Sequence, residues 1–203
     1  MAVSFTATTV ANPAGAQGSY PLTQVVGHEG MIADLQAYVS RSFRNQTGAA
    51  IPYGVLVATD NTPSSNDALA VEIATGTTLI QGIAVSSQVL EGASLGSSYT
   101  PVPTPVYSDG RYGYPDKETV NVVSKGVIWV YSVDAIAIGD AVRFYKADYT
   151  GTTAGAFLGR FGKTAVATKT IAVTGARWVS ETAAGGLALL EIDIPGMTYS
   201  ADT

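Results

Sequence analysis

Residues 187–194, LALLEIDI, decide the fold class of this chain because apolar and acidic side chains alternate along them. The apolar residues at even positions from 190 onward fall on one side of an extended strand, and Glu191 and Asp193 fall on the other. Successive side chains of a β-strand point to opposite faces, so the pattern predicts a strand with one buried and one solvated face. Two acids on the solvated face are a simpler interpretation than a glycosidase-type carboxylate pair.

Short β-like runs of this kind recur along most of the chain. With 22 glycines and 9 prolines among 203 residues, the composition suits many tight turns and disfavours a helical protein. Strands are expected at residues 55–59, 69–74, 79–86, 119–124, 127–132, 141–145, 157–161, 170–174 and 187–194. Short strands at this density predict an all-β protein, an antiparallel β-sandwich or barrel of jelly-roll type.

The N-terminal part of the chain has a different character. Residues 3–20 are rich in Thr, Ala, Gly and Pro without periodicity and predict an extended arm. Residues 30–44 fit both a helical stripe and a strand, and their β-branched and aromatic content favours a strand over 38–43. We therefore divide the chain into residues 1–44, an extended N-terminal arm with a first strand or short helix, and residues 45–203, a β-sandwich or barrel core.

Cysteine and histidine counts exclude several function classes. The chain has no cysteine and one histidine, so it has no disulfide framework, thiolate nucleophile or multi-histidine metal site. Its formal net charge of −5 argues against a general nucleic-acid binder, which needs a basic face. The first residues show no signal-peptide pattern, and no apolar run is long enough to cross a bilayer, so we expect the protein to fold in a cytoplasm-like compartment.

Two short motifs resemble catalytic or phosphate-binding signatures, and both are expected to be turns. Residues 92–96, GASLG, match the G-x-S-x-G pattern, but the one histidine, His28, lies upstream and no strand–helix alternation surrounds Ser94. Residues 162–164, GKT, match the end of a phosphate-binding loop, but the glycine required five residues earlier is Phe157. We therefore predict no enzyme, and no catalytic, cofactor-binding or metal-ligating residue.

Residues 99–115, YTPVPTPVYSDGRYGYP, hold four prolines and four tyrosines. Alternate prolines stiffen a chain toward polyproline II, and tyrosine offers amphipathic contact area at a low entropy cost. One interpretation is a contact loop for a neighbouring subunit, a capsid surface or a sugar, and the other is a loop lying on its own sheet. On the first interpretation, the protein-contact residues are Tyr99, Tyr107, Tyr112 and Tyr114.

The surface is expected to be poor in charge and unevenly charged. Apolar residues make up 46% of the chain and charged residues 13%, which indicates that other subunits cover part of the apolar surface. Residues 45–110 hold five acids and no base, whereas residues 111–177 hold nine bases and five acids. This asymmetry either steers self-association or docking on a charged partner, or is scatter on a solvated surface.

Seven segments form an ordered series over most of residues 25–194, and residues 99–115 and 146–175 interrupt it. The segments are GMIAD (30–34), IPYGVLV (51–57), QGIAV (81–85), VNVVSKGVIWV (120–130), IGDAV (138–142), ARWV (176–179) and GGLALLEI (185–192). Taken together in this order, they resemble the structural cement, or capsid decoration, proteins of tailed bacteriophages.

The resemblance implies a β-rich homotrimer on the outside of an icosahedral capsid, at or near local threefold axes. There it would clamp neighbouring coat subunits against the pressure of packaged DNA. Its partners would be the major capsid protein and further copies of itself, without cofactor, nucleic acid or membrane, and it would join the virion in the host cytoplasm. The alternative is a carbohydrate- or receptor-binding β module of a phage tail or fibre.

Overall fold

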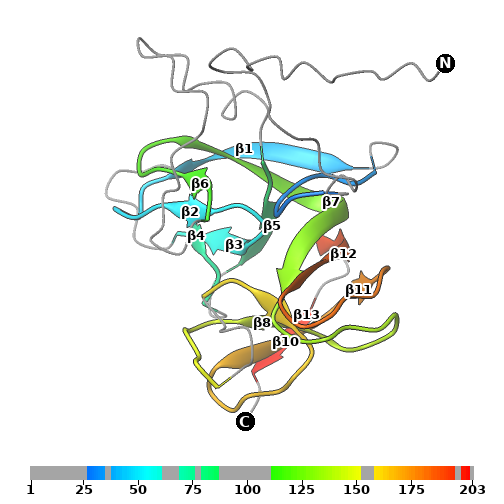
Figure 1. Ribbon diagram of the computed structural model, residues 1–203. Helices are drawn as coiled ribbons and strands as arrows, with labels where there is room; N and C mark the ends of the chain where they lie inside the picture. Colours follow the sequence, from blue (N-terminus) through cyan, green and yellow to red (C-terminus); the bar gives the residue numbers. More distant parts are fainter. Residues whose placement is uncertain are drawn as a thin grey trace, which may run out of the picture.

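The computed structural model describes residues 27–34, 38–60, 69–75, 79–86, 111–151, 158–194 and 198–201. These residues form an all-β protein (Figure 1). They include no α-helix, and hence no apolar helix long enough to span a membrane. The tyrosines Tyr99 and Tyr107 and the GASLG motif lie outside the described residues.

Thirteen strands are formed by the described part of the chain. They are β1 (Val39–Asn45), β2 (Ile51–Pro52), β3 (Leu56–Thr59), β4 (Ala70–Ile73), β5 (Ile80–Ala84), β6 (Gly113–Tyr114), β7 (Thr119–Ser132), β8 (Val142–Tyr145), β9 (Phe161–Gly162), β10 (Thr170–Thr174), β11 (Ala176–Trp178), β12 (Gly186–Asp193) and β13 (Thr198–Ala201). Most pairs are antiparallel, as predicted, but β1 pairs with β4 and β7 with β9 in parallel.

Five strands close into a ring. Their pairing runs β1–β4–β3–β5–β7, and β7 pairs again with β1, so each of the five has a hydrogen-bonded neighbour on both edges. Closure of this kind removes free strand edges. The ring agrees with the predicted barrel alternative, and the expected boundary between residues 44 and 45 falls inside β1, one of its members.

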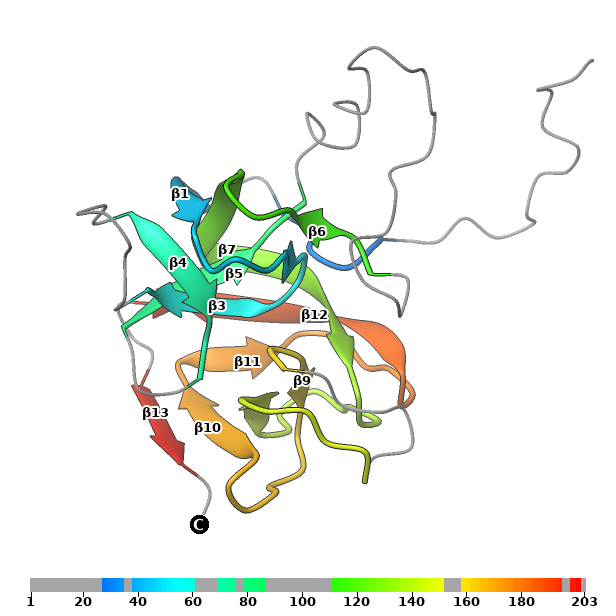
Figure 2. The same cartoon turned by 90° about the vertical axis from the view of Figure 1, so that its left-hand side faces the viewer.

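The second lobe is built on the other half of β7. Strands β12 and β9 pair with β7, β11 pairs with β12, and β8, β10 and β13 follow β9 in order. Figures 1 and 2 show β7 running from the ring into this lobe, next to β12. A single strand of 14 residues therefore belongs to both lobes.

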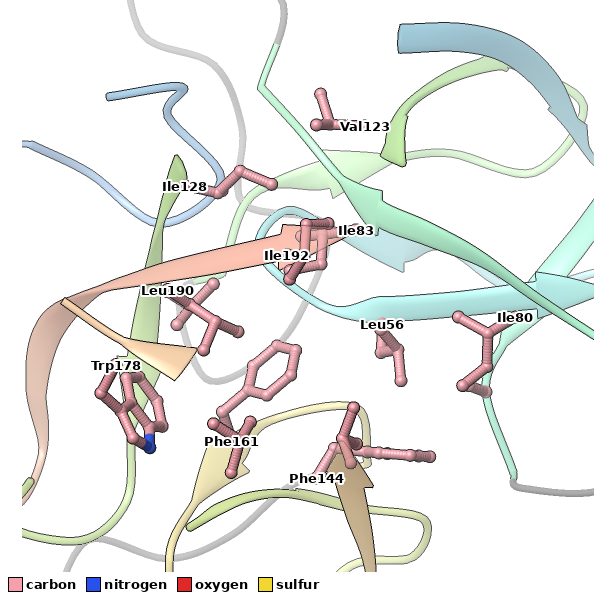
Figure 3. Packing of buried hydrophobic residues seen from close by; sticks show 14 of the residues in the cluster. Leu56, Ile80, Ile83, Val123, Ile128, Phe144, Phe161, Trp178, Leu190 and Ile192 are labelled. Atoms are coloured by element: carbon pink, nitrogen blue, oxygen red, sulfur yellow. The ribbon is translucent and has the colours of Figure 1, made fainter. Parts of the chain in front are cut away.

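Two ring strands, β3 and β5, are buried on both faces. Val57 of β3 and Ala84 of β5 belong to the cluster enclosed by the ring, whereas their neighbours Leu56 and Ile83 belong to the larger cluster outside it. The larger cluster packs the outside of the ring against the second lobe, including Phe161 and the other residues labelled in Figure 3. Burial of both faces explains the nearly continuous apolar sequence of these strands.

A β-bulge in β7 reverses the two faces of the strand relative to the ring cluster and the outer cluster. Val122 faces the ring cluster, and without an extra residue Ile128 would face the same side, since strands repeat every two residues. Ile128 instead lies in the outer cluster, with Val123. The pairing with β1 shifts by one residue at Ser124, which provides the change of phase.

The bulge also corrects one sequence prediction. Residues 119–124 and 127–132 were expected to form two strands separated by a turn, but they form one strand because the residues between them make a bulge. Gly126 has φ +146° there, a conformation that favours glycine. Strands were predicted at 55–59, 69–74, 79–86, 141–145, 170–174 and 187–194, and strands are found in all six places. The strand predicted at 157–161 is wrong for residues 158–160, where a turn precedes β9, which begins at Phe161. The short strands β2, β6, β11 and β13 were not predicted.

A second bulge lies in the neighbouring strand β5, where Gly82 packs directly on the backbone of β7. The pairing of β3 with β5 shifts by one residue next to Gly82, which has φ +151°. A Cβ atom at this position would collide with the carbonyl oxygen of Val123. The two bulged strands therefore approach more closely than any residue with a side chain would allow.

We predict that Gly82→Ala destabilises the protein by about 3 kcal/mol, because the methyl group must push two buried strands apart. The matched control is Gly48→Ala, since Gly48 also has a positive φ (+75°) but a Cβ there would meet no atom within 4 Å. Denaturant unfolding of the two variants measures the difference. Equal destabilisation by both substitutions would contradict the proposed collision with β7.

Tyr114 is a core residue. It lies in β6 with a fully buried side chain, and its ring meets that of Tyr53 edge to face, with the centroids 5.1 Å apart. Its hydroxyl donates a hydrogen bond to the carbonyl of Val85 at 2.5 Å. Burial raises the pKa of Tyr114 well above the usual value of 10. Burial also raises the pKa of Tyr145, to about 12.

We predict that stability falls as the pH rises above 10. The unfolded chain then loses tyrosine protons that the folded chain retains, which favours unfolding by up to about 1.4 kcal/mol per pH unit for each such tyrosine. Tyr114→Phe should therefore flatten the decline between about pH 10 and 12, although loss of its hydrogen bond costs about 1–2 kcal/mol at pH 7. The measurement is urea unfolding at several pH values. Tyr112→Phe, which removes an exposed hydroxyl of the same segment, serves as the control, and identical pH profiles for both variants would contradict the prediction.

Candidate contact surfaces

Residues 27–33 lie along the second half of β7 and bond to it through the backbone. Gly30 donates to the carbonyl of Trp129, Trp129 donates to the carbonyl of Met31, and Ala33 donates to the carbonyl of Val127, each at 2.8 Å. Gly27 packs on the indole of Trp129, where a Cβ atom would not fit. This attachment is named here the arm root; the extended arm predicted over residues 3–20 lies outside the described residues.

A buried cation holds the arm root to the second lobe. Arg160 precedes β9, is 7% exposed, and places its guanidinium 3.9 Å from the ring centroid of Tyr131. Its Nε lies 3.9 Å from Oε1 of Glu29 in the arm root. Arg160 thus contacts both Glu29 and Tyr131, and Glu29→Gln would remove the acid that faces this nearly buried guanidinium.

The GKT motif is the end of β9 followed by a bend, and it offers no phosphate-binding loop. The backbone N–H groups of Lys163 and Thr164 both donate to Oδ2 of Asp134, at 2.7 and 2.9 Å. In a phosphate-binding loop such amides would face the phosphate. Here a carboxylate of the same chain occupies them, at a bend that follows β9, whose last residue is Gly162.

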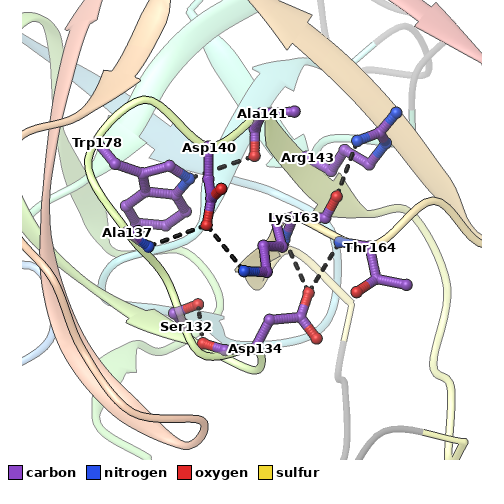
Figure 4. A network of polar contacts seen from close by, with 9 residues as sticks. All are labelled: Ser132, Asp134, Ala137, Asp140, Ala141, Arg143, Lys163, Thr164 and Trp178. Carbon is purple, nitrogen blue, oxygen red and sulfur yellow. Dashed lines mark hydrogen bonds and ion pairs between the residues drawn. The ribbon is translucent and has the colours of Figure 1, made fainter.

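A second carboxylate shapes the turn before β8 (Figure 4). Oδ2 of Asp140 accepts hydrogen bonds from the backbone N–H of Ala137 and from Nζ of Lys163, both at 2.9 Å. The bond from Lys163, followed by that from Ala137, lowers the pKa of Asp140 below its usual value. Trp178 donates from its indole to the carbonyl of Ala141 at 3.3 Å, which ties the same turn to the core.

The remaining candidate acids and the lone histidine make local contacts. Glu191 accepts from Arg177 at 2.7 Å and Asp193 pairs with Lys125 at 3.0 Å, while their neighbours Leu190 and Ile192 are buried. The predicted alternation of buried and solvated residues along β12 is thus confirmed. His28 lies 2.8 Å from the hydroxyl of Ser86. Among the described residues, no group of acids and histidine could hold a metal ion.

The predicted contact tyrosines are in different environments. Tyr112 is 39% exposed, so its ring is available to a partner. Tyr114 packs in the core and offers no surface while β6 is folded. Tyr99 and Tyr107 lie outside the described residues, and their contact role stays a prediction.

Large exposed apolar side chains mark surface that the sequence analysis did not assign. The most exposed are Leu79 and Ile138, and Ile138 is 65% exposed at the turn held by Asp140. An apolar residue directly before Gly139 and Asp140 was the available signal, because a Gly-Asp turn places its preceding residue at the surface. Trp178, in contrast, is buried in the core.

Comparison with known proteins identifies the family. The family model described as structural cement protein (E217 gp24/Pam3 gp6) matches residues 16–193. A chain from the solved structure "The capsid of Myoviridae Phage XM1" shares the fold, with a TM-score of 0.57 and 17% sequence identity over 88% of this chain and 98% of that chain. No curated protein matches. The chain therefore belongs to the phage structural cement protein family and is a structural protein of the phage capsid.

Proposed function

We propose that this protein binds the outer surface of the assembled capsid as a homotrimer, at or near local threefold axes, and clamps coat subunits against the pressure of packaged DNA. The family match over residues 16–193 carries the proposal. The direct partners are the major capsid protein and further copies of this chain. Catalysis, a cofactor, nucleic acid and a membrane have no part in this function.

The physical character of the surface supports a cementing role. A clamp needs buried area and close fit, and small uncharged side chains lose little hydration when they are covered. Exposed residues of this kind lie in the loops at 135–141 and 181–185. The closed ring and the shared strand β7 make the framework stiff, so binding orders few additional groups.

Such a protein acts by mass action. A ligand that binds only the assembled shell stabilises that state by an amount that grows with its occupancy. Three copies in one trimer bind neighbouring coat subunits together, so weak individual contacts add through their high effective concentration. The clamp therefore resists separation of coat subunits without any chemical step.

We predict that purified particles carry about as many copies of this chain as of coat protein if every local threefold axis is occupied, because three coat subunits surround each axis. Particles assembled without the protein should release their DNA at a lower temperature, and adding the purified protein should raise that temperature. Quantitative mass spectrometry and a thermal DNA-release assay measure the two quantities.

Two outcomes would contradict the proposal. A few copies per particle would place the protein at the tail or a vertex and favour the carbohydrate- or receptor-binding module. Full decoration with no change in the release temperature would show that the protein binds the shell without clamping it.

We predict that Tyr112→Ala weakens attachment to undecorated capsids by about tenfold, because an exposed tyrosine ring is a common anchor in protein interfaces. The backbone carbonyl that Tyr112 offers to Tyr53 remains, so the fold should persist. Leu69→Ala removes an exposed apolar side chain of another segment and is the control. Binding measured by co-sedimentation should be unchanged in the control, and unchanged binding of Tyr112→Ala would remove this residue from the interface.

A further inference from the structure

The end of the second lobe is a rigid apolar projection, named here the tip (residues 135–141 and 181–185). Two backbone hydrogen bonds, at 2.9 and 3.1 Å, join Ile136 and Thr182 and so hold the two loops together. Asp140 and Lys163 fix the turn that carries Ile138 (Figure 4). A single exposed isoleucine is ordinary on a protein surface, but one on a turn held this firmly is preorganised to enter a pocket.

A cavity of about 170 Å³ lies at the other end of β7, in the wall of the ring. Its lining is more apolar than polar and comprises Arg41, Phe43, Gln81, Val122, Ser124 and Ile194. Two of these residues, Gln81 and Ser124, are the extra residues of the bulges in β5 and β7. Bulges of this kind are common at barrel rims and beside functional sites, because they redirect side chains and open the pairing.

The tip and the cavity are complementary. The cavity has room for a branched aliphatic side chain, and its apolar lining suits Ile138. Arg41 at the cavity and Glu181 at the tip are both exposed and carry opposite charges. Most exposed residues of the tip are small or apolar, which is typical of the core of contacts between copies of one chain.

The two features cannot meet within one molecule. Ser124 and Ser132 lie in the same strand, eight residues and thus about 26 Å apart, and Ile138 lies beyond Ser132. A projection and a cavity at opposite ends therefore make a heterologous, head-to-tail contact between copies. Such a contact closes into a ring when the rotation between copies fits a whole number of them.

We infer that Ile138 of one copy inserts into the cavity beside Ser124 of the next copy, and that three such contacts close the trimer. This inference rests on the trimer of the proposed function and names its interface. The side chain enters against Phe43 and Val122, while Glu181 approaches Arg41 of the neighbouring copy. The tip is then buried between copies, and Tyr112 stays available to the coat protein.

We predict that cysteines placed at the two positions form disulfides between copies. The chain has no native cysteine, so the background is clean. A variant with both Ile138→Cys and Ser124→Cys, treated with a mild oxidant, should give covalent dimers and trimers on a non-reducing denaturing gel, and no larger species. Mixing chains that carry only one of the two cysteines should give the mixed dimer, because the contact joins unlike surfaces.

Several outcomes would overturn this interface. The double variant would fail to cross-link, or Ile138→Cys alone would cross-link efficiently with itself, or the gel would show covalent species larger than a trimer. As a test without cysteine, Ile138→Asp should shift the sedimentation profile from trimer to monomer, whereas Leu69→Asp, at an exposed position outside both the tip and the cavity lining, should not. A monomeric but fully capsid-binding wild-type chain would reject the interface and leave the capsid-binding function standing. A trimer that fails to bind capsids would reject the capsid-binding function and leave the interface standing.

Discussion

The one-residue bulge in β7 is the constraint on which both lobes depend. Strand β7 has 14 residues, and it contributes Val122 to the ring core and Ile128 to the outer core, on opposite faces of the strand. Without the extra residue at Ser124, the apolar side chains in the second half of β7 would point away from the outer core. The fold therefore requires a bulge in its longest strand, and Gly82 of β5 packs directly on the backbone next to this bulge.

A shared strand also couples the surfaces of the molecule. The arm root bonds to Trp129, the cavity lies beside Ser124, and the turn that carries Ile138 follows the end of the strand. None of these positions can shift far without moving a strand buried in two cores. A protein that must hold neighbouring subunits in fixed places gains from this, because stiffness lowers the entropy lost on binding.

Strands whose buried residues alternate with exposed ones could be predicted from the sequence. Residues that become buried only when the five-stranded ring closes could not. The alternation at Leu190 and Glu191 gives β12 directly, since it needs no knowledge of the partner strand. The parallel pairing of β1 with β4 arises only when the ring closes, and two-residue strands such as β6 are too short to show a period. The burial of Tyr114 has the same origin, because its partner Tyr53 is distant in sequence. The exposed Ile138 was visible in sequence only as the residue before a turn.

The placement of four charged groups explains why the loops that they hold expose mostly small and apolar residues. Asp134, Asp140 and Lys163 bond to the backbone and to one another around two turns, and Arg160 is buried against Tyr131. Charges used in this way fix the shape of the loops and leave the exposed faces of those loops to small and apolar residues. An interface made from such loops desolvates few ions, and the desolvation of ions often cancels the gain from an interfacial ion pair. Binding strength then depends on fit, and the turn held by Asp140 supplies a fixed shape for a partner to fit.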